Sequence, residues 1–379
     1  MIGRLRKILT EHWCELGLSA EPKAEQVRWL VINGGITVRS KLVCFVWVEG
    51  GLPGFVVKFP RFREYNECLA AEYRTLQKVQ QYVPRVPRSQ PMVPRPLMVT
   101  EADGLLVTFE SSLEGILLRS YLREHPHRVL TVLGKLDPFV TWLASMHLQS
   151  ARPMSLDKMF TLVLEPLTRA SEIVSGVTPL EARTLDRLCT YARILAEREI
   201  LLTVFNHHDL GTTNLLVGRQ GNFAGLIDWE SGALDLPLMD LIYFMARFAY
   251  DTRGSGPGAD QLRGFREFFF GERSTSAAAL PSFVARGWLA GYCEMLGLSV
   301  KWMPVLFAHT WLLHARNEHR RILELRDEGY ILHGKPAVSE ALDVSQDAAQ
   351  KGHFRSQLRY YLENMEQSLP VMMAGGLTT

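Results

Sequence analysis

Three oxygen-bearing side chains are the first feature of this sequence that suggests chemistry. Asp209 and Asn214 lie in the segment HHDLGTTN (residues 207–214), directly before a short apolar run. A second short apolar run, joined to the first by a turn at 218–222, ends in Asp228. Two adjacent strands joined in this way form a hairpin, which places the loop before the first strand beside the residue that ends the second. The pattern therefore predicts that the three side chains converge.

Carboxylate and amide oxygens of this kind suit Mg²⁺. Asp209 precedes the other two residues and is the predicted general base, because it can reach the hydroxyl of an acceptor. The alternative for Asp209 and Asn214 is that they only satisfy the hydrogen bonds of a turn. Phosphoryl transfer needs such a metal clamp and base, together with a cation on the phosphates and an oriented hydroxyl.

Lys58 is the candidate for the cation. It lies within the apolar strand candidate 55–59, where a lysine is out of place unless it is paired. Glu72 follows in a segment with helical spacing, 64–82, and a helix packed on the sheet can present it to Lys58. This arrangement resembles the strand lysine and helix glutamate that hold the phosphates in protein kinases. The alternative is an edge-strand lysine that faces water.

Gly34 and Gly35 lie between two strand candidates and are the predicted phosphate loop. Glycines at such a place allow the backbone to close over phosphates. The sequence has no G-x-G-x-x-G here, so a plain hairpin turn is the alternative.

The elements that must position these residues fall into two groups. Strand candidates dominate the first part of the chain, with the helix 64–82 after the third of them: 29–32, 41–48, 55–59, 97–100 and 105–109. Beyond Gly115 the spacing is mainly helical: 116–124, 129–150, 177–198 and 236 onward. We therefore predict an α+β fold in which a small antiparallel five-stranded β lobe with one helix precedes a large, mainly helical lobe. A ligand cleft is expected at the junction.

The predicted organisation is a nucleotide-binding β lobe at 1–108, a hinge at 109–115, a helical lobe at 116–368 and a mobile tail at 369–379. The chain has 379 residues and a net charge of +2, which gives no reason to expect nucleic acid or a membrane as a partner. Its five cysteines form no C-x-x-C pair, so neither a zinc site nor a disulfide framework is predicted. Because no apolar run approaches the roughly 20 residues that cross a bilayer, we expect a cytoplasmic protein. We also expect it to be a monomer or a homodimer.

The two chemical motifs resemble those of the aminoglycoside phosphotransferase and choline kinase-like family. Members carry His-Gly-Asp-Leu-His-x-Gly-Asn and then a strand that ends in Ile-Asp-Trp-Glu. The present chain has HHDLGTTN at 207–214 and LIDWESG at 226–232. Supporting similarities are DLPLMDL at 235–241, LASMH at 143–147 and the hinge VTFESSLEG at 107–115. The resemblance covers about residues 29–250.

The resemblance implies a bilobal protein-kinase-like fold and an ATP- and magnesium-dependent kinase that phosphorylates a hydroxyl of a small molecule. The implied roles are Asp209 as catalytic base, Asn214 and Asp228 as Mg²⁺ ligands, Lys58 held by Glu72 on the ATP phosphates, and the backbone near Glu110 and Ser112 at the adenine. His207 and Asp240 would brace the catalytic loop. Trp229 and Glu230 would face the acceptor, although core packing is the alternative for Trp229.

Three departures from the family pattern lie beside the predicted base. His208 replaces the usual glycine, Gly211 replaces the second histidine, and Thr213 replaces the glycine before the asparagine. Protein kinases carry arginine at the place of His208, so we expect that the backbone there does not need a glycine. The changes leave the predicted base and metal positions intact and leave the acceptor open among aminoglycosides, amino alcohols and sugar-like compounds.

Two other classes of protein remain as alternatives. A pseudokinase-like module would bind a nucleotide or a partner without turnover, but a decayed site usually loses one of the residues that this chain retains. A protein kinase is disfavoured because Trp229 and Glu230 replace Phe-Gly after Asp228 and no activation segment follows.

Overall fold

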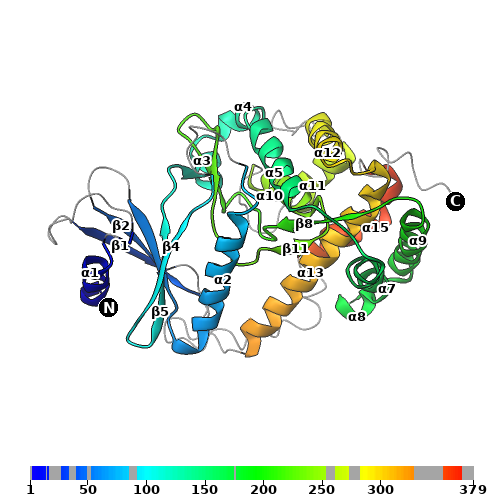
Figure 1. The fold of residues 1–379 in the computed structure, drawn as a ribbon. Coiled ribbons are helices and arrows are strands. Elements are labelled where there is room, and N and C mark those ends of the chain that lie inside the picture. The colour runs from blue at the N-terminus through cyan, green and yellow to red at the C-terminus, as the bar shows by residue number, and fades with distance from the viewer. Residues whose placement is uncertain are drawn as a thin grey trace. The chain divides into compact units, whose positions relative to one another are not determined.

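The computed structural model, shown in Figure 1, describes most of the chain. The described residues are 2–13, 15–16, 27–33, 40–48, 53–84, 92–174, 176–252, 261–272, 282–327 and 353–368. The chain divides into two compact units. The first comprises Met1–Gly115 and Ala224–Gly232, and the second Ile116–Phe223 and Ala233–Thr379.

A five-stranded sheet forms the centre of the first unit, with its strands in the order β1-β2-β3-β5-β4. Its strands are β1 (Arg28–Asn33), β2 (Leu42–Trp47), β3 (Phe55–Phe59), β4 (Pro96–Ala102) and β5 (Leu105–Ser111). All neighbouring strands are antiparallel. The register places Lys58 of β3 opposite Val43 of β2 and Thr108 of β5.

Among the described residues, two α-helices accompany this sheet. The amphipathic helix α1 (Ile2–Glu11) buries Leu5 and Leu9 in the same apolar cluster as Val57 of β3 and Phe109 of β5. α2 (Asn66–Val79) lies between the third and fourth strands in sequence and buries an apolar face that also carries Glu72. The sheet therefore shares its core with a helix at the start of the chain, and α2 carries a charged group into the unit.

The second unit is mainly helical, as Figure 1 shows. Its first helices are α3 (Leu118–Glu124), α4 (Val129–Leu133), α5 (Asp137–Ser150), α6 (Leu156–Met159), the π-helix Phe160–Leu164, α7 (Glu165–Thr168), α8 (Ala170–Ile173) and α9 (Pro179–Ala196). The later ones are α10 (Met239–Asp251), α11 (Gln261–Phe270), α12 (Ser282–Leu296), α13 (Met303–Asp327) and α15 (His353–Glu363). The predicted α+β class, with a five-stranded antiparallel sheet before a mainly helical region, is confirmed.

Short strands interrupt the helices. β8 (Leu202–Asn206) pairs with β7 (Arg152–Pro153) and β11 (Ala233–Asp235). β9 (Leu215–Val217) pairs with β6 (Ile116–Leu117). A turn closed by the Gly218 N–H and the Asn222 carbonyl, 2.8 Å apart, leads from β9 into β10 (Phe223–Leu226). β8 ends directly before the HHDLGTTN segment and so fixes the position at which that loop begins.

Two sequence predictions about elements were wrong. The expected helix 129–150 is broken into α4 and α5, because Pro138 in the first turn of α5 has no N–H to continue a helix from the preceding turn. The strand expected to end in Asp228 ends at Leu226, so Asp228 lies in the loop beyond it.

No single helix among the described residues is long and apolar enough to cross a membrane. One bent pair, Pro126–Leu133 with Asp137–Ser150 at 50°, reaches the required length and composition together.

Candidate active site

Lys58 forms two buried ion pairs in the first unit. Its Nζ lies 2.7 Å from Glu72 Oε1 and 2.9 Å from Glu110 Oε1. Glu110 is opposite Val56, and side chains alternate along a strand, so Glu110 and Lys58 lie on the same face of the sheet. The contact expected between Lys58 and Glu72 is therefore present, and Glu110 adds a second carboxylate. Binding of nucleotide phosphates by Lys58 stays a prediction.

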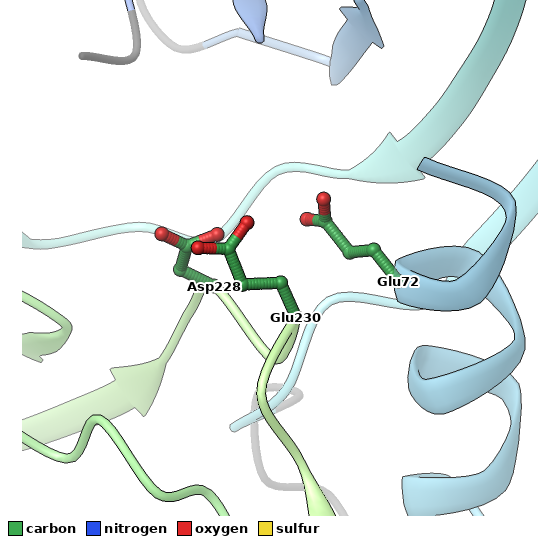
Figure 2. Close-up of side chains that lie close together, drawn as sticks. All are labelled: Glu72, Asp228 and Glu230. Carbon is green, nitrogen blue, oxygen red and sulfur yellow. The ribbon is translucent and has the colours of Figure 1, made fainter. Parts of the chain in front are cut away.

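A second lysine lies at the same group of carboxylates. Lys41, directly before β2, has its Nζ 2.7 Å from Glu72 Oε2, 2.7 Å from Asp228 Oδ1 and 2.8 Å from Glu230 Oε2. Figure 2 shows the three carboxylates, with Glu72 extending from α2 toward Asp228 and Glu230 in the loop after β10. Glu72 thus bridges the two lysines, one through each of its oxygens.

The charges of this group determine its pKa values. Burial acts to lower the pKa of Lys41, but Glu72, Asp228 and Glu230 outweigh it and raise that pKa well above its ordinary range. Burial also acts to lower the pKa of Lys58, but Glu110 and then Glu72 outweigh it and raise that pKa. Burial acts to raise the pKa of Glu72, yet the two lysines hold it below its ordinary value. Both lysines are therefore cations at neutral pH.

The carboxylates nearest Lys41 have the chemistry of a site for a hard divalent cation. One oxygen from each of Glu72, Asp228 and Glu230 lies within 4.8 Å of the others. Oxygen ligands of this kind fit Mg²⁺. Asp228 has φ of 65°, a left-handed conformation that is unfavourable for a non-glycine residue and is often found at functional sites.

Asp209 lies in the second unit, and both of its carboxylate oxygens accept hydrogen bonds. Asn214 Nδ2 donates to Oδ2 at 3.0 Å and also to the Asp209 carbonyl at 2.8 Å. The Tyr243 hydroxyl, from α10, donates to Oδ1 at 3.3 Å. Burial and the neighbouring Asp209 raise the pKa of Tyr243, so its hydroxyl keeps its proton and remains a donor. The Tyr243 ring stacks on His314, with ring centroids 3.9 Å apart.

A buried aspartate holds the backbone of the same loop. Asp240 accepts hydrogen bonds from the backbone N–H groups of His207 at 2.6 Å and His208 at 2.9 Å. His147 Nε2 lies 3.5 Å from the same carboxylate, and its Nδ1 lies 2.5 Å from the Tyr292 hydroxyl oxygen. Burial acts to raise the pKa of Asp240, but its histidine neighbours keep it lowered. Asp240 thus braces the loop as expected.

His208 has an unusual backbone conformation. Its φ is 64°, in the left-handed region that favours glycine, yet the chain adopts it with a histidine, in line with the expectation that a glycine is not required here. The side chain is mostly buried, with Nε2 3.6 Å from Asp235 Oδ2. The chain therefore accepts a strained histidine directly before Asp209.

Other predicted site residues have the following positions. Asp228 belongs to the first unit and Asp209 with Asn214 to the second, so convergence of the three stays a prediction. Gly34 and Gly35 lie outside the described residues.

Near the predicted adenine site, the Ser112 hydroxyl donates to the Pro53 carbonyl at 2.6 Å. Trp229 is fully buried, with its indole N–H 3.3 Å from the Leu226 carbonyl, while Glu230 is half exposed and binds Lys41. The predicted roles of Glu110 and Ser112 at adenine, and of Trp229 and Glu230 at the acceptor, stay predictions.

Sequence reasoning missed three contributors: Lys41, the carboxylate of Glu110, and Tyr243. Lys41 was hard to predict. Its position on the same sheet face as Lys58 follows from the register, in which Val43 lies opposite Lys58. Tyr243 has the same i, i+3 spacing from Asp240 that core residues of a helix have. Nothing in its local sequence separates it from the apolar residues of α10.

Comparison with known proteins places the chain in a family. Residues 34–277, more than half of the chain, match the model of the phosphotransferase enzyme family named APH. The chain therefore belongs to this family, as its motifs led us to expect. A search of curated proteins found no match.

Solved structures with a similar fold include several small-molecule kinases. Glucosamine kinase in complex with glucosamine, ADP and inorganic phosphate is 15% identical over 88% of this chain and 83% of its own, with a TM-score of 0.46. Macrolide 2'-phosphotransferase type I is 14% identical over 90% and 95%, with a TM-score of 0.45. Ethanolamine kinase from Plasmodium vivax is 12% identical over 88% and 85%, with a TM-score of 0.40. Identities this low do not define the substrate of this chain.

Proposed function

We propose that this protein is an ATP- and Mg²⁺-dependent kinase that transfers the γ-phosphoryl group to a hydroxyl of a small molecule. The observation that carries the proposal is the environment of Asp209 in a chain of the phosphotransferase family. Asn214 and Tyr243 each donate to one of its oxygens, and Asp240 holds the loop before it. A carboxylate oriented in this way is suited to accept the proton of an attacking hydroxyl.

The other residues are proposed to bind the phosphate donor and its metal ion. Lys58, fixed between Glu72 and Glu110, would bind the phosphates of ATP, and backbone groups near Glu110 and Ser112 would bind the adenine. Asn214 and Asp228 would hold Mg²⁺, which neutralises charge on the transferred group when it is bound. The acceptor oxygen forms its bond to the γ-phosphorus as the bond to the β–γ bridging oxygen breaks, and the acceptor proton passes to Asp209.

The acceptor belongs, in this proposal, to the classes expected from the sequence: aminoglycosides, amino alcohols or sugar-like compounds. Glu230, half exposed beside Asp228, and Trp229 are proposed to lie on the acceptor side. We further propose a cytoplasmic monomer or homodimer.

The test is release of ADP from Mg²⁺-ATP across a panel of aminoglycosides, amino alcohols, sugars and nucleosides. Turnover that depends on one class of acceptor supports the proposal and identifies the class. Binding of Mg²⁺-ATP without turnover of any acceptor would instead support the pseudokinase-like alternative and reject the kinase.

A further inference from the structure

Lys41 uses the full donor capacity of its ammonium group. An ammonium group has three N–H donors. Lys41 has three carboxylate oxygens within 2.8 Å of Nζ, one each from Glu72, Asp228 and Glu230. Its side chain is 13% exposed, so water contributes little to its solvation. The Lys41 ammonium therefore occupies the position between the three carboxylates that another cation could take.

The charges around Lys41 explain why a cation is needed there. Glu72 and Asp228 are brought close together although both are acidic, and Glu230 adds a third negative charge. Like charges at this distance repel strongly when they are shielded from water. Lys58 contacts Glu72 but neither of the other two carboxylates at ion-pair distance among the described contacts. Among the described ion pairs, Lys41 is thus a cation that contacts both Asp228 and Glu230.

We propose that Lys41 is an internal counter-ion of the metal-free protein, and that a divalent cation binding to Asp228 must displace the Lys41 ammonium from that carboxylate. The inference rests on the proposed function for the role of Asp228. A divalent ion and an ammonium group compete for the same oxygens and repel each other, so both cannot retain Asp228 Oδ1 as a close partner. Lys41 would therefore set the metal affinity of the nucleotide-free protein.

The direct test removes the charge of Lys41 and keeps an unbranched side chain that is one atom shorter. We expect the full-length Lys41→Met protein, free of nucleotide, to bind Mn²⁺ about tenfold more tightly than the native protein in a titration followed by electron paramagnetic resonance. Lys41→Arg keeps a cation and is expected to bind Mn²⁺ as weakly as the native protein. Lys301→Met is the matched control, because Lys301 makes an exposed ion pair with Glu199. Equal or weaker Mn²⁺ binding by Lys41→Met would overturn the proposal.

A second measurement uses the native protein and tests displacement of the Lys41 ammonium even if Lys41→Met does not fold. An ion-paired ammonium reacts slowly with acylating reagents, because only the neutral amine is nucleophilic. We expect acetylation of Lys41, quantified by mass spectrometry, to rise several-fold when Mg²⁺ alone is added, while acetylation of Lys301 stays constant. Unchanged acetylation of Lys41 at saturating Mg²⁺ would reject displacement.

Neither measurement uses an acceptor or depends on turnover. A protein that shows the Lys41 effects but phosphorylates nothing would reject the proposed kinase function and keep the counter-ion. A protein that phosphorylates an acceptor but shows neither effect would reject the counter-ion and keep the kinase.

Discussion

At the scale of single residues, the surroundings of Asp209 determine what its carboxylate can do. Asn214 donates to Oδ2 and Tyr243 donates to Oδ1, so two neutral donors help to orient the side chain. Hydrogen bonds of this kind favour the ionised form of a carboxyl group, which is the form that accepts a proton.

Removal of the Tyr243 hydroxyl tests this orientation. Tyr243→Phe keeps the ring on His314 and deletes the donor to Asp209. We expect kcat to fall about threefold to tenfold, the equivalent of one net hydrogen bond, with KM for ATP unchanged. Steady-state kinetics measure both, and Tyr191→Phe on α9 is the control. A changed KM for ATP with an unchanged kcat would contradict a role at Asp209.

Some site residues were predictable because the sequence showed a local conflict. Lys58 stood out because a lysine inside an apolar strand needs a partner, and Glu72 was the acidic residue on a nearby helix. Lys41 showed no such conflict, since it lies directly before its strand. Its contact with Asp228 spans 187 residues, which no local pattern reveals.

At the scale of elements, the five strands of the sheet were predictable because each is a short run of β-branched and aromatic residues between turn signals. α2 and α9 were predictable from their helical spacing. β8 was missed because its flanking strands, β7 and β11, are two and three residues long and distant in sequence. The conformation of His208 was missed because φ at one residue depends on the contacts that Asp240 makes with its neighbours.

A buried ion pair connects two helices of the second unit. Arg355 of α15 donates to both oxygens of Glu181 on α9, at 2.6 and 2.9 Å, and both side chains are buried. Glu181 also accepts a hydrogen bond from the Thr178 backbone N–H, as part of the capping box of α9. Burial acts to raise the pKa of Glu181, but Arg355 and the Thr178 backbone outweigh it and hold that pKa below its ordinary value.

Arg355→Met would remove the closest cation from the buried Glu181 carboxylate and leave it the more distant Arg359, at 3.6 Å. We expect a loss of about 3 kcal/mol or more in the free energy of unfolding at neutral pH, measured by denaturant titration. Arg187→Met, which removes an exposed pair with Glu366, is the control and should cost less than about 1 kcal/mol. Similar losses in the two variants would contradict the importance of the buried pair.

The depressed pKa of Glu181 also predicts a pH dependence. Its contribution to native stability is fully present above the unfolded pKa of about 4.3 and is lost as pH falls through the lower folded value. The difference in unfolding free energy between native protein and Arg355→Met should therefore shrink on acidification below about pH 4.

At the scale of the whole molecule, both the class of fold and the family were predictable from the sequence. The motifs at 207–214 and 226–232 pointed to the family that the model match at 34–277 then showed. α1 lies outside that match and still shares the apolar core of the sheet. Its role required the structure, because amphipathic spacing alone does not say what a helix packs against.

Ligand binding should stabilise the whole chain by mass action. At a concentration one hundred times Kd, Mg²⁺-ATP is expected to add about 2.7 kcal/mol to the free energy of unfolding and to raise Tm. Asp228→Ala should lose the part of this shift that depends on Mg²⁺, because the variant lacks the proposed metal ligand. Thermal unfolding with Mg²⁺-ATP and with ATP plus chelator measures that part. An undiminished Mg²⁺-dependent shift in Asp228→Ala would contradict the metal assignment.

Asp209 is proposed as the base of a phosphoryl transfer, and the kcat of Asp209→Ala with the acceptor that the panel identifies tests this role. We predict a loss on the order of a hundredfold or more, because a positioned base is removed, with Mg²⁺-ATP affinity close to native. Asp186→Ala, on the exposed surface of α9, should retain native kcat. Turnover by Asp209→Ala at the native rate would contradict the role of Asp209 as the base.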